Sequence, residues 1–183
     1  DELLDQLTYE DMATMINVGG WQTAEVTSVG KIATSDCDGP AGVNNFITGT
    51  YGTPYPTEVL MAQTWNTELA VAFSEAMGQE FADYHVTGWY APSMNIHRSA
   101  FGGRDFEYYS EDPLLTGMCA AADTKGVQSH KGMGTTIKHF AANSQEDNRM
   151  FNNAHISERA LREIYLKGFE IAVKTAQPMS IMT

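Results

Sequence analysis

The chain has 183 residues, of which 43% are hydrophobic and 19% are charged, a composition typical of a globular protein that can bury a sizeable core. Eleven Lys and Arg residues against 23 Asp and Glu residues give a formal net charge of −12. This acidic balance disfavours binding to nucleic-acid phosphates or anionic membranes. We expect neither a membrane span nor a signal peptide, because no long apolar run and no basic head are present, and the cellular compartment stays open.

Short apolar runs alternate with amphipathic stretches along the first half of the chain. Residues 32–35 predict a strand, and the turn-rich residues 36–40 follow it, with Asp36 as a turn residue. A helix comes next, which Asn66 or Thr67 can cap. Its predicted buried face has apolar side chains at 3.6-residue spacing: Leu69, Ala72, Phe73, Ala76, Met77 and Phe81.

The same alternation continues in the second half. Residues 86–91 predict a second strand, a polar loop follows, and a helix is expected over roughly residues 114–129. Residues 135–137 open a third strand that runs into a Lys-His pair. Ser157 can cap a third helix, and residues 179–183 begin a fourth strand. The third helix shares an apolar face made of Leu161, Ile164, Tyr165, Gly168 and Ala172.

Alternating strands and helices predict an α/β fold with a parallel sheet. Four such units fit the first half of a (β/α)8 TIM-like barrel, with helical crossovers, or a smaller doubly wound sheet. Two observations favour the half barrel. No glycine-rich phosphate-binding sequence follows the first strand. Polar residues also cluster after the predicted strands, where barrel enzymes build their sites: Asp38, Arg98, Arg104, Lys138 and His139.

A parallel strand at the end of the sequence needs a strand on each side and packing against both of its faces, which half a barrel does not provide. We therefore expect residues 1–183 to be the N-terminal portion of a barrel that further polypeptide completes. The two cysteines, Cys37 and Cys119, fit no disulfide or metal pattern, and we expect both thiols to be buried. No ligand cluster has metal spacing, so the sequence implies no metal and no organic cofactor.

Three segments carry residues suited to binding or chemistry. They are residues 35–43 (SDCDGPAGV), residues 95–98 (NIHR) together with residues 103–113 (GRDFEYYSEDP), and residues 138–149 (KHFAANSQEDNR). Together, and in this order, they resemble the N-terminal catalytic barrel of glycoside hydrolase family 3, and within it the β-glucosidases. The resemblance spans residues 34–183.

The resemblance implies a retaining, exo-acting hydrolase of β-linked glucosides. Such enzymes use a carboxylate nucleophile and a carboxylic acid about 5–5.5 Å apart. In the family the nucleophile is an aspartate on a later strand, and the acid usually comes from a following domain. The resemblance therefore places no catalytic carboxylate in this chain, and the nucleophile is expected after Thr183. The remaining barrel and a C-terminal domain are likewise expected outside it.

Five residues match sugar-binding positions of the family. The resemblance implies that Asp38 accepts hydrogen bonds from the 4-OH and 6-OH of the sugar and that Arg104 contacts the ring hydroxyls. It implies that Lys138 and His139 hold the hydroxyl edge around O2 to O4 as paired donors, Lys138 with three donors and His139 with one or two, depending on its tautomer. Arg149 is expected to fix or polarise a carboxylate near the same site. The resemblance also implies non-proline cis peptides around residues 138–140.

Other polar residues of these segments are expected to serve the scaffold. Arg98 is expected at the rim, and three acidic residues should anchor the loop and pair with arginines: Glu107, Glu111 and Asp112. Trp21 could stack on a sugar, whereas Trp89 is expected in the core. The sequence after Phe140 differs from the N-acetylglucosaminidase branch, and Asp38 favours a hexose over a xyloside.

Two alternatives stay open. The chain could be a catalytically incomplete, sugar-binding or structural polypeptide, or it could belong to a β-xylosidase or arabinosidase of the same family. The expected partners are a β-glucoside or oligosaccharide substrate and the remainder of the barrel.

Overall fold

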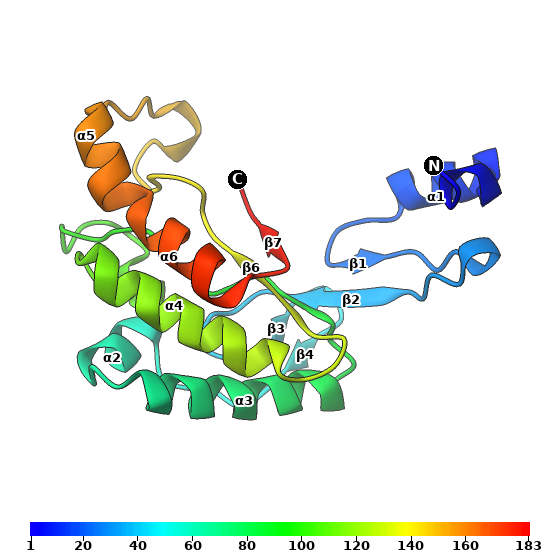
Figure 1. Cartoon of the computed structure of the whole chain (residues 1–183), viewed down its shortest axis with the longest axis horizontal. Helices are drawn as coiled ribbons and strands as arrows, with labels where there is room; N and C mark the ends of the chain where they lie inside the picture. Colours follow the sequence, from blue (N-terminus) through cyan, green and yellow to red (C-terminus); the bar gives the residue numbers. More distant parts are fainter.

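The computed structural model describes all 183 residues, and its centre is a five-stranded sheet in the order β1-β2-β5-β6-β7 (Figure 1). Its strands are Gln22–Thr23 (β1), Thr34–Cys37 (β2), Gly88–Trp89 (β5), Gly134–Ile137 (β6) and Ser180–Ile181 (β7). Strands β2, β5, β6 and β7 pair in parallel, and β1 pairs with β2 in the antiparallel direction. The four parallel strands confirm the predicted half barrel.

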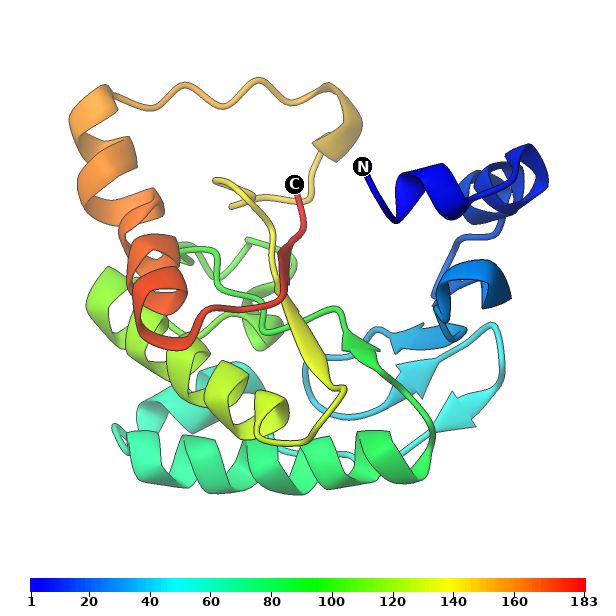
Figure 2. The same cartoon turned by 45° about the vertical axis from the view of Figure 1, so that its right-hand side comes forward.

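Three long helices connect the parallel strands. Helix α3 (Thr67–Asp83) joins β2 to β5, α4 (Pro113–Gln128) joins β5 to β6, and α6 (Lys167–Ala176) joins β6 to β7. Figure 2 shows them along the outside of the sheet, with α4 packed between α3 and α6. The predicted caps are present, because Asn66 accepts a hydrogen bond from the Leu69 amide and Ser157 accepts one from the Ala160 amide.

Helix α6 is preceded by α5 (Glu158–Ala160) and a single π-helical turn, Leu161–Tyr165. The apolar face predicted for this region is largely confirmed, since Tyr165, Gly168 and Ala172 are buried.

The buried face of α3 differs from the prediction. Leu69, Ala72 and Ala76 are exposed, and the buried residues are Ala70, Ser74, Met77, Gly78 and Phe81. The reason is the close crossing of α3 and α4. A Cβ on Gly126 of α4 would overlap Ser74 Oγ and would lie 2.7 Å from the Val71 carbonyl oxygen. Small residues thus set the contact face of α3.

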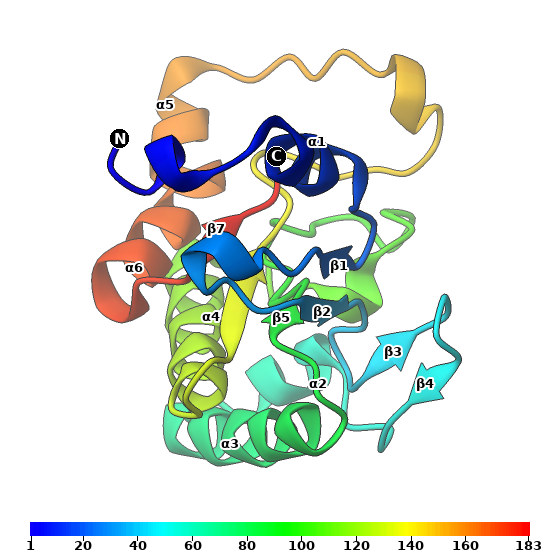
Figure 3. The same ribbon diagram turned by 90° about the vertical axis from the view of Figure 1, so that its right-hand side faces the viewer.

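The structure adds elements that the sequence pattern did not predict. Helix α1 (Tyr9–Asn17) precedes β1, a hairpin of β3 (Asn44–Asn45) and β4 (Thr50–Tyr51) follows β2, and α2 (Glu58–Gln63) precedes α3. Figure 3 shows the hairpin beside β2, on the side away from β7. Strand β2 extends through Asp36 to Cys37, so the prediction of Asp36 as a turn residue was wrong.

The core lies between the sheet and the helices. Trp89, Phe81 and Met77 pack there together with Cys37, while Cys119 belongs to a second cluster under α6. Both cysteines and Trp89 are buried, as predicted, and burial raises the pKa of each thiol to about 12. No helix has the length and the apolar character that a membrane crossing requires.

Candidate functional site

A cleft of about 670 Å³ opens beyond the carboxyl ends of the parallel strands. All five residues predicted for the sugar site line it. Asp38 directly follows β2, Arg104 lies in the loop after β5, and Lys138 and His139 directly follow β6. Arg149 begins a short 3-10 helix, Arg149–Phe151. Loops from three parallel strands therefore converge on one cavity, as the half-barrel prediction requires.

Lys138 is the most deeply buried charge in the cleft, with only 2% of the residue exposed. Its Nζ atom donates a hydrogen bond of 2.8 Å to Asp38 Oδ1 and lies 3.6 Å from Glu107 Oε2. A buried ammonium is tolerated only where opposite charge compensates its lost hydration. The two carboxylates provide that compensation and fix the position of the lysine side chain.

Glu107 is buried beneath the cleft and fully engaged. Its Oε1 atom pairs with Arg104 Nε, and its Oε2 atom accepts a hydrogen bond of 2.7 Å from Ser93 Oγ. The expectation that Glu107 pairs with an arginine is confirmed. Because both oxygens already have donors, this carboxylate orients the cations around it.

The second arginine, Arg149, reaches a carboxylate of this same chain. Its guanidinium donates to Glu146 Oε2 at 2.9 Å, and Arg104 lies 3.7 Å from Glu146 Oε1. Asn143 also donates to Glu146 Oε1, at 3.1 Å. Glu146 therefore holds both arginines at one edge of the cleft.

The Asn95 side chain holds His139 in place by hydrogen bonds to the His139 backbone. The His139 amide donates to Asn95 Oδ1 and Asn95 Nδ2 donates to the His139 carbonyl, both at 2.8 Å. The ring Nδ1 atom lies 3.2 Å from the same Oδ1 atom and 3.4 Å from the Tyr108 hydroxyl. Burial, followed by the charges of Arg104 and Lys138, lowers the pKa of His139 to about 4.

The imidazole is therefore neutral at pH 7. If Nδ1 donates to Asn95, Nε2 is left as a hydrogen-bond acceptor. In the other tautomer Nε2 carries the proton and donates, so the role of His139 as a donor to the sugar stays a prediction. The peptide bonds Lys138–His139 and Phe140–Ala141 are both cis, which confirms the expected cis geometry in this segment.

Tyr90, which was not predicted from the sequence, also belongs to the cleft wall. Its hydroxyl donates to Asp36 Oδ2 at 3.0 Å, and burial together with that carboxylate raises its pKa to about 12. The strand pattern could have indicated this position, because Trp89 faces the core and the side chain of the next residue, Tyr90, must point to the opposite face of the sheet. Trp21 also lines the cleft, where its ring contacts Tyr90 and Phe46.

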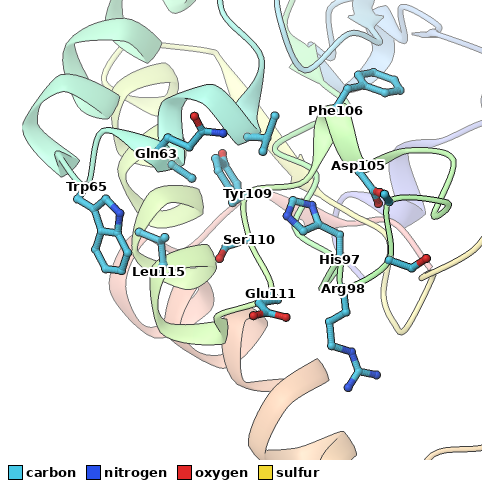
Figure 4. A pocket seen from close by; sticks show the side chains of 14 residues that line it. Gln63, Trp65, His97, Arg98, Asp105, Phe106, Tyr109, Ser110, Glu111 and Leu115 are labelled. Atoms are coloured by element: carbon cyan, nitrogen blue, oxygen red, sulfur yellow. The ribbon is translucent and has the colours of Figure 1, made fainter.

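Arg98 lies outside this cleft. Its guanidinium donates to the Tyr165 hydroxyl and lies 5.5 Å from the centre of that ring. Arg98 lines a separate pocket of about 770 Å³, as does Glu111. Figure 4 shows the side chains around this pocket. Asp112 caps α4 by accepting from the Leu114 and Leu115 amides, in keeping with its expected structural role. No group of three or more His, Cys, Asp or Glu side chains is arranged to hold a metal ion.

Comparison with known proteins identifies the family. Residues 11–183 match the profile described as "Glycosyl hydrolase family 3 N terminal domain". The chain is 42% identical over 186 residues to "Beta-glucosidase A" of Butyrivibrio fibrisolvens, an alignment that covers 97% of this chain and 22% of that protein. It is also 42% identical over 187 residues to an "Exo-alpha-(1->6)-L-arabinopyranosidase" of Bifidobacterium longum, covering 96% of this chain and 25% of that protein.

A solved structure agrees with this assignment. Beta-glucosidase 3B from Thermotoga neapolitana, in complex with α-D-glucose, superimposes with a TM-score of 0.86 at 44% identity. The superposition covers 98% of this chain and 28% of that one. The chain thus spans about a quarter of the length of the proteins it matches. On these grounds the chain belongs to glycosyl hydrolase family 3, with residues 11–183 matching the N-terminal domain profile of that family.

Proposed function

We propose that this chain supplies the sugar-binding half of the active site of a retaining, exo-acting β-glucosidase. The observation that carries the proposal is the convergence of Asp38, Lys138 and His139 with two arginines on one cleft. Carboxylate, ammonium, imidazole and guanidinium groups together can accept from and donate to several hydroxyls of one pyranose ring. Homologues named as β-glucosidases support the glucoside as substrate.

Asp38 is the residue best placed to select the sugar. Its Oδ1 atom accepts from Lys138 and from the Gly39 amide, at 2.8 and 3.1 Å, and its Oδ2 atom makes no hydrogen bond within the chain. The side chain is 40% exposed, toward the cleft. Oδ2 is thus free to accept from a sugar hydroxyl, such as the 4-OH or the 6-OH.

The catalytic carboxylates belong, in this proposal, to polypeptide beyond residues 1–183. A retaining mechanism needs a nucleophile and an acid about 5–5.5 Å apart on either side of the glycosidic bond. The acidic residues at the cleft already make other contacts, because Glu107 and Glu146 pair with arginines and Asp38 pairs with Lys138 through its Oδ1 atom. The rest of the barrel would bring the nucleophile to the open side of the cleft.

A pentopyranosidase is the second candidate function. The Bifidobacterium longum relative is named as an arabinopyranosidase and is as similar to this chain as the β-glucosidase from Butyrivibrio fibrisolvens. A β-xylosidase would belong to the same group, since xylose and arabinopyranose both lack the 6-hydroxymethyl group. These sugars would leave Asp38 with one hydroxyl partner fewer than glucose.

The test is hydrolysis by the whole protein that contains this chain. Its kcat/KM should be compared on nitrophenyl β-D-glucopyranoside, β-D-xylopyranoside and α-L-arabinopyranoside, and proton NMR should record the anomer released first. We expect the glucoside to give the highest kcat/KM, with the β-anomer of glucose as the first product.

Three results would count against the proposal. A preference for the arabinoside or the xyloside would favour the second candidate. Release of the α-anomer would exclude retention. Glucose binding without hydrolysis of any of the three substrates would indicate a sugar-binding protein without catalytic activity.

A further inference from the structure

A buried acidic side chain lies behind the cleft, outside the set of residues that line it. Glu58, the first residue of α2, is 1% exposed, and no ion pair compensates it. Burying a carboxyl group in this way carries a large desolvation cost. A polar group buried at such cost calls for a structural or functional explanation.

Ser93 connects Glu58 to the cleft. The Ser93 amide donates a hydrogen bond of 3.0 Å to Glu58 Oε1, and the Ser93 hydroxyl donates one of 2.7 Å to Glu107 Oε2. Ser93 and Glu107 are both buried. Since Glu107 pairs with Arg104 and lies 3.6 Å from Lys138 Nζ, the contacts run without a gap from Glu58 to the two cations of the cleft.

The surroundings of Glu58 favour its neutral form. The charged or titratable groups around it are Asp123, Glu107, Lys138, Tyr109 and Cys119. Asp123 accepts hydrogen bonds from the Tyr109 and Ser74 hydroxyls, whereas Glu58 accepts only the single amide of Ser93. The better hydrogen-bonded carboxyl keeps the negative charge more easily, so Glu58 holds the proton. Burial, and then the charge of Asp123, raises the pKa of Glu58 well above its usual value.

We infer that Glu58 is a positioning residue of the sugar site: through Ser93 it fixes Glu107, which in turn holds Lys138 and Arg104 in the cleft. The inference rests on the proposed function, because its readout is sugar binding. The neutral carboxyl accepts from the Ser93 amide without adding a negative charge behind Glu107. When Glu58 ionises at high pH, the added charge repels Glu107 and Asp123 and loosens the arrangement.

The experiment compares Glu58→Leu, Glu58→Gln and Ser93→Ala in the whole protein. Leucine removes the acceptor for the Ser93 amide, while glutamine keeps the shape and an acceptor oxygen without an ionisable proton. Inhibition by glucose gives Ki, and thermal unfolding by circular dichroism reports the folded state. We expect Glu58→Leu to raise the Ki for glucose at least tenfold and Glu58→Gln to restore most of that loss. Ser93→Ala should raise Ki too, and Glu58→Leu should add little in the Ser93→Ala background.

The pH dependence of glucose binding distinguishes a positioning role of Glu58 from a role in packing alone. The wild type should lose affinity for glucose as the pH rises and Glu58 ionises, and Glu58→Gln should show a smaller loss. Glu75→Leu is the matched control, because Glu75 is exposed on α3 and its side chain makes no ion pair. That variant should leave Ki unchanged.

The outcomes distinguish the two levels of the proposal. A wild type that neither binds glucose nor is inhibited by it would overturn the proposed function, and this inference with it. If the wild type binds glucose and Glu58→Leu has the same Ki, the inference alone is overturned. If Glu58→Leu does not fold, Glu58→Gln and Ser93→Ala test the inference instead. An unchanged Ki in Ser93→Ala, or an alkaline loss in Glu58→Gln as large as that of the wild type, would then refute the inference.

Discussion

The Lys138 ammonium donates a hydrogen bond of 2.8 Å to the Asp38 carboxylate, although the two residues are 100 positions apart in the chain. The parallel sheet explains this contact. Strands β2 and β6 flank β5, and both residues directly follow their strands, so both emerge at the same edge. If Asp38 binds the sugar as proposed, this contact connects the substrate-binding carboxylate with the buried lysine.

Replacement of Asp38 tests its assignment to the sugar. Asp38→Ala removes the free Oδ2 acceptor and a partner of Lys138. We expect a loss of several kcal/mol in transition-state stabilisation, which is roughly 100- to 1,000-fold in kcat/KM. Steady-state kinetics of the whole protein on nitrophenyl glucoside measure this loss, with Asp5→Ala, at an exposed position, as the control. A folded Asp38→Ala protein with normal kcat/KM would mean that Asp38 does not bind the sugar.

Replacement of Lys138 tests the buried charge balance. Lys138→Met leaves the buried carboxylate of Glu107 with one cation fewer and Asp38 without its partner. Removing one member of a buried ion pair costs about 3–5 kcal/mol, so the unfolding temperature should drop clearly. Differential scanning calorimetry would record it. Lys131→Met, at an exposed loop position, should leave the temperature unchanged. An equal, small effect of both variants would contradict the importance of this pair.

The lowered pKa of His139, about 4, predicts an acid-sensitive contribution to stability. In the unfolded chain the imidazole takes up a proton near its usual pKa of about 6.5, while the folded state does not. Stability from this group is therefore complete above about pH 6.5 and is lost as the pH falls toward 4.

A comparison of unfolding temperatures between pH 7 and pH 4 measures this contribution. The wild type should lose more stability over that interval than His139→Gln, in which the group cannot titrate. Parallel curves for the two proteins would show that His139 titrates normally in the folded state.

Gly126 tests the close crossing of α3 and α4. Alanine normally stabilises a helix interior by about 1 kcal/mol relative to glycine. Here the added Cβ would lie 2.7 and 2.8 Å from the backbone atoms Val71 O and Glu75 N, which can yield only if the helices separate. Overpacking of this kind costs typically 1–3 kcal/mol, so Gly126→Ala should lower the unfolding temperature.

Gly19→Ala is the control for that variant, since nothing lies within 4 Å of a Cβ at Gly19. It should leave the unfolding temperature nearly unchanged. An increase for Gly126→Ala would show that the two helices adjust without cost.

Much of the architecture follows from local pattern. The 3.6-residue spacing, the capping residues Asn66 and Ser157, and the short β-rich runs locate the long helices and the parallel strands, because each signal acts over a few neighbouring residues. The motif segments likewise place Asp38, Arg104 and Lys138 after the strands. Each of these predictions depends only on where a residue lies in the chain relative to a predicted helix or strand.

The tertiary structure alone decided the remainder. The buried face of α3 depends on the small residues of α4 that it crosses, and Asp36 lies in a strand because β2 pairs with β5 beyond the apolar run. Neither the pairing of Lys138 with Asp38 nor the burial of Glu58 behind Ser93 can be read from spacing. Both arise where distant segments meet, because a buried ionisable group needs a compensating charge or hydrogen bond there, and no local sequence pattern specifies that partner.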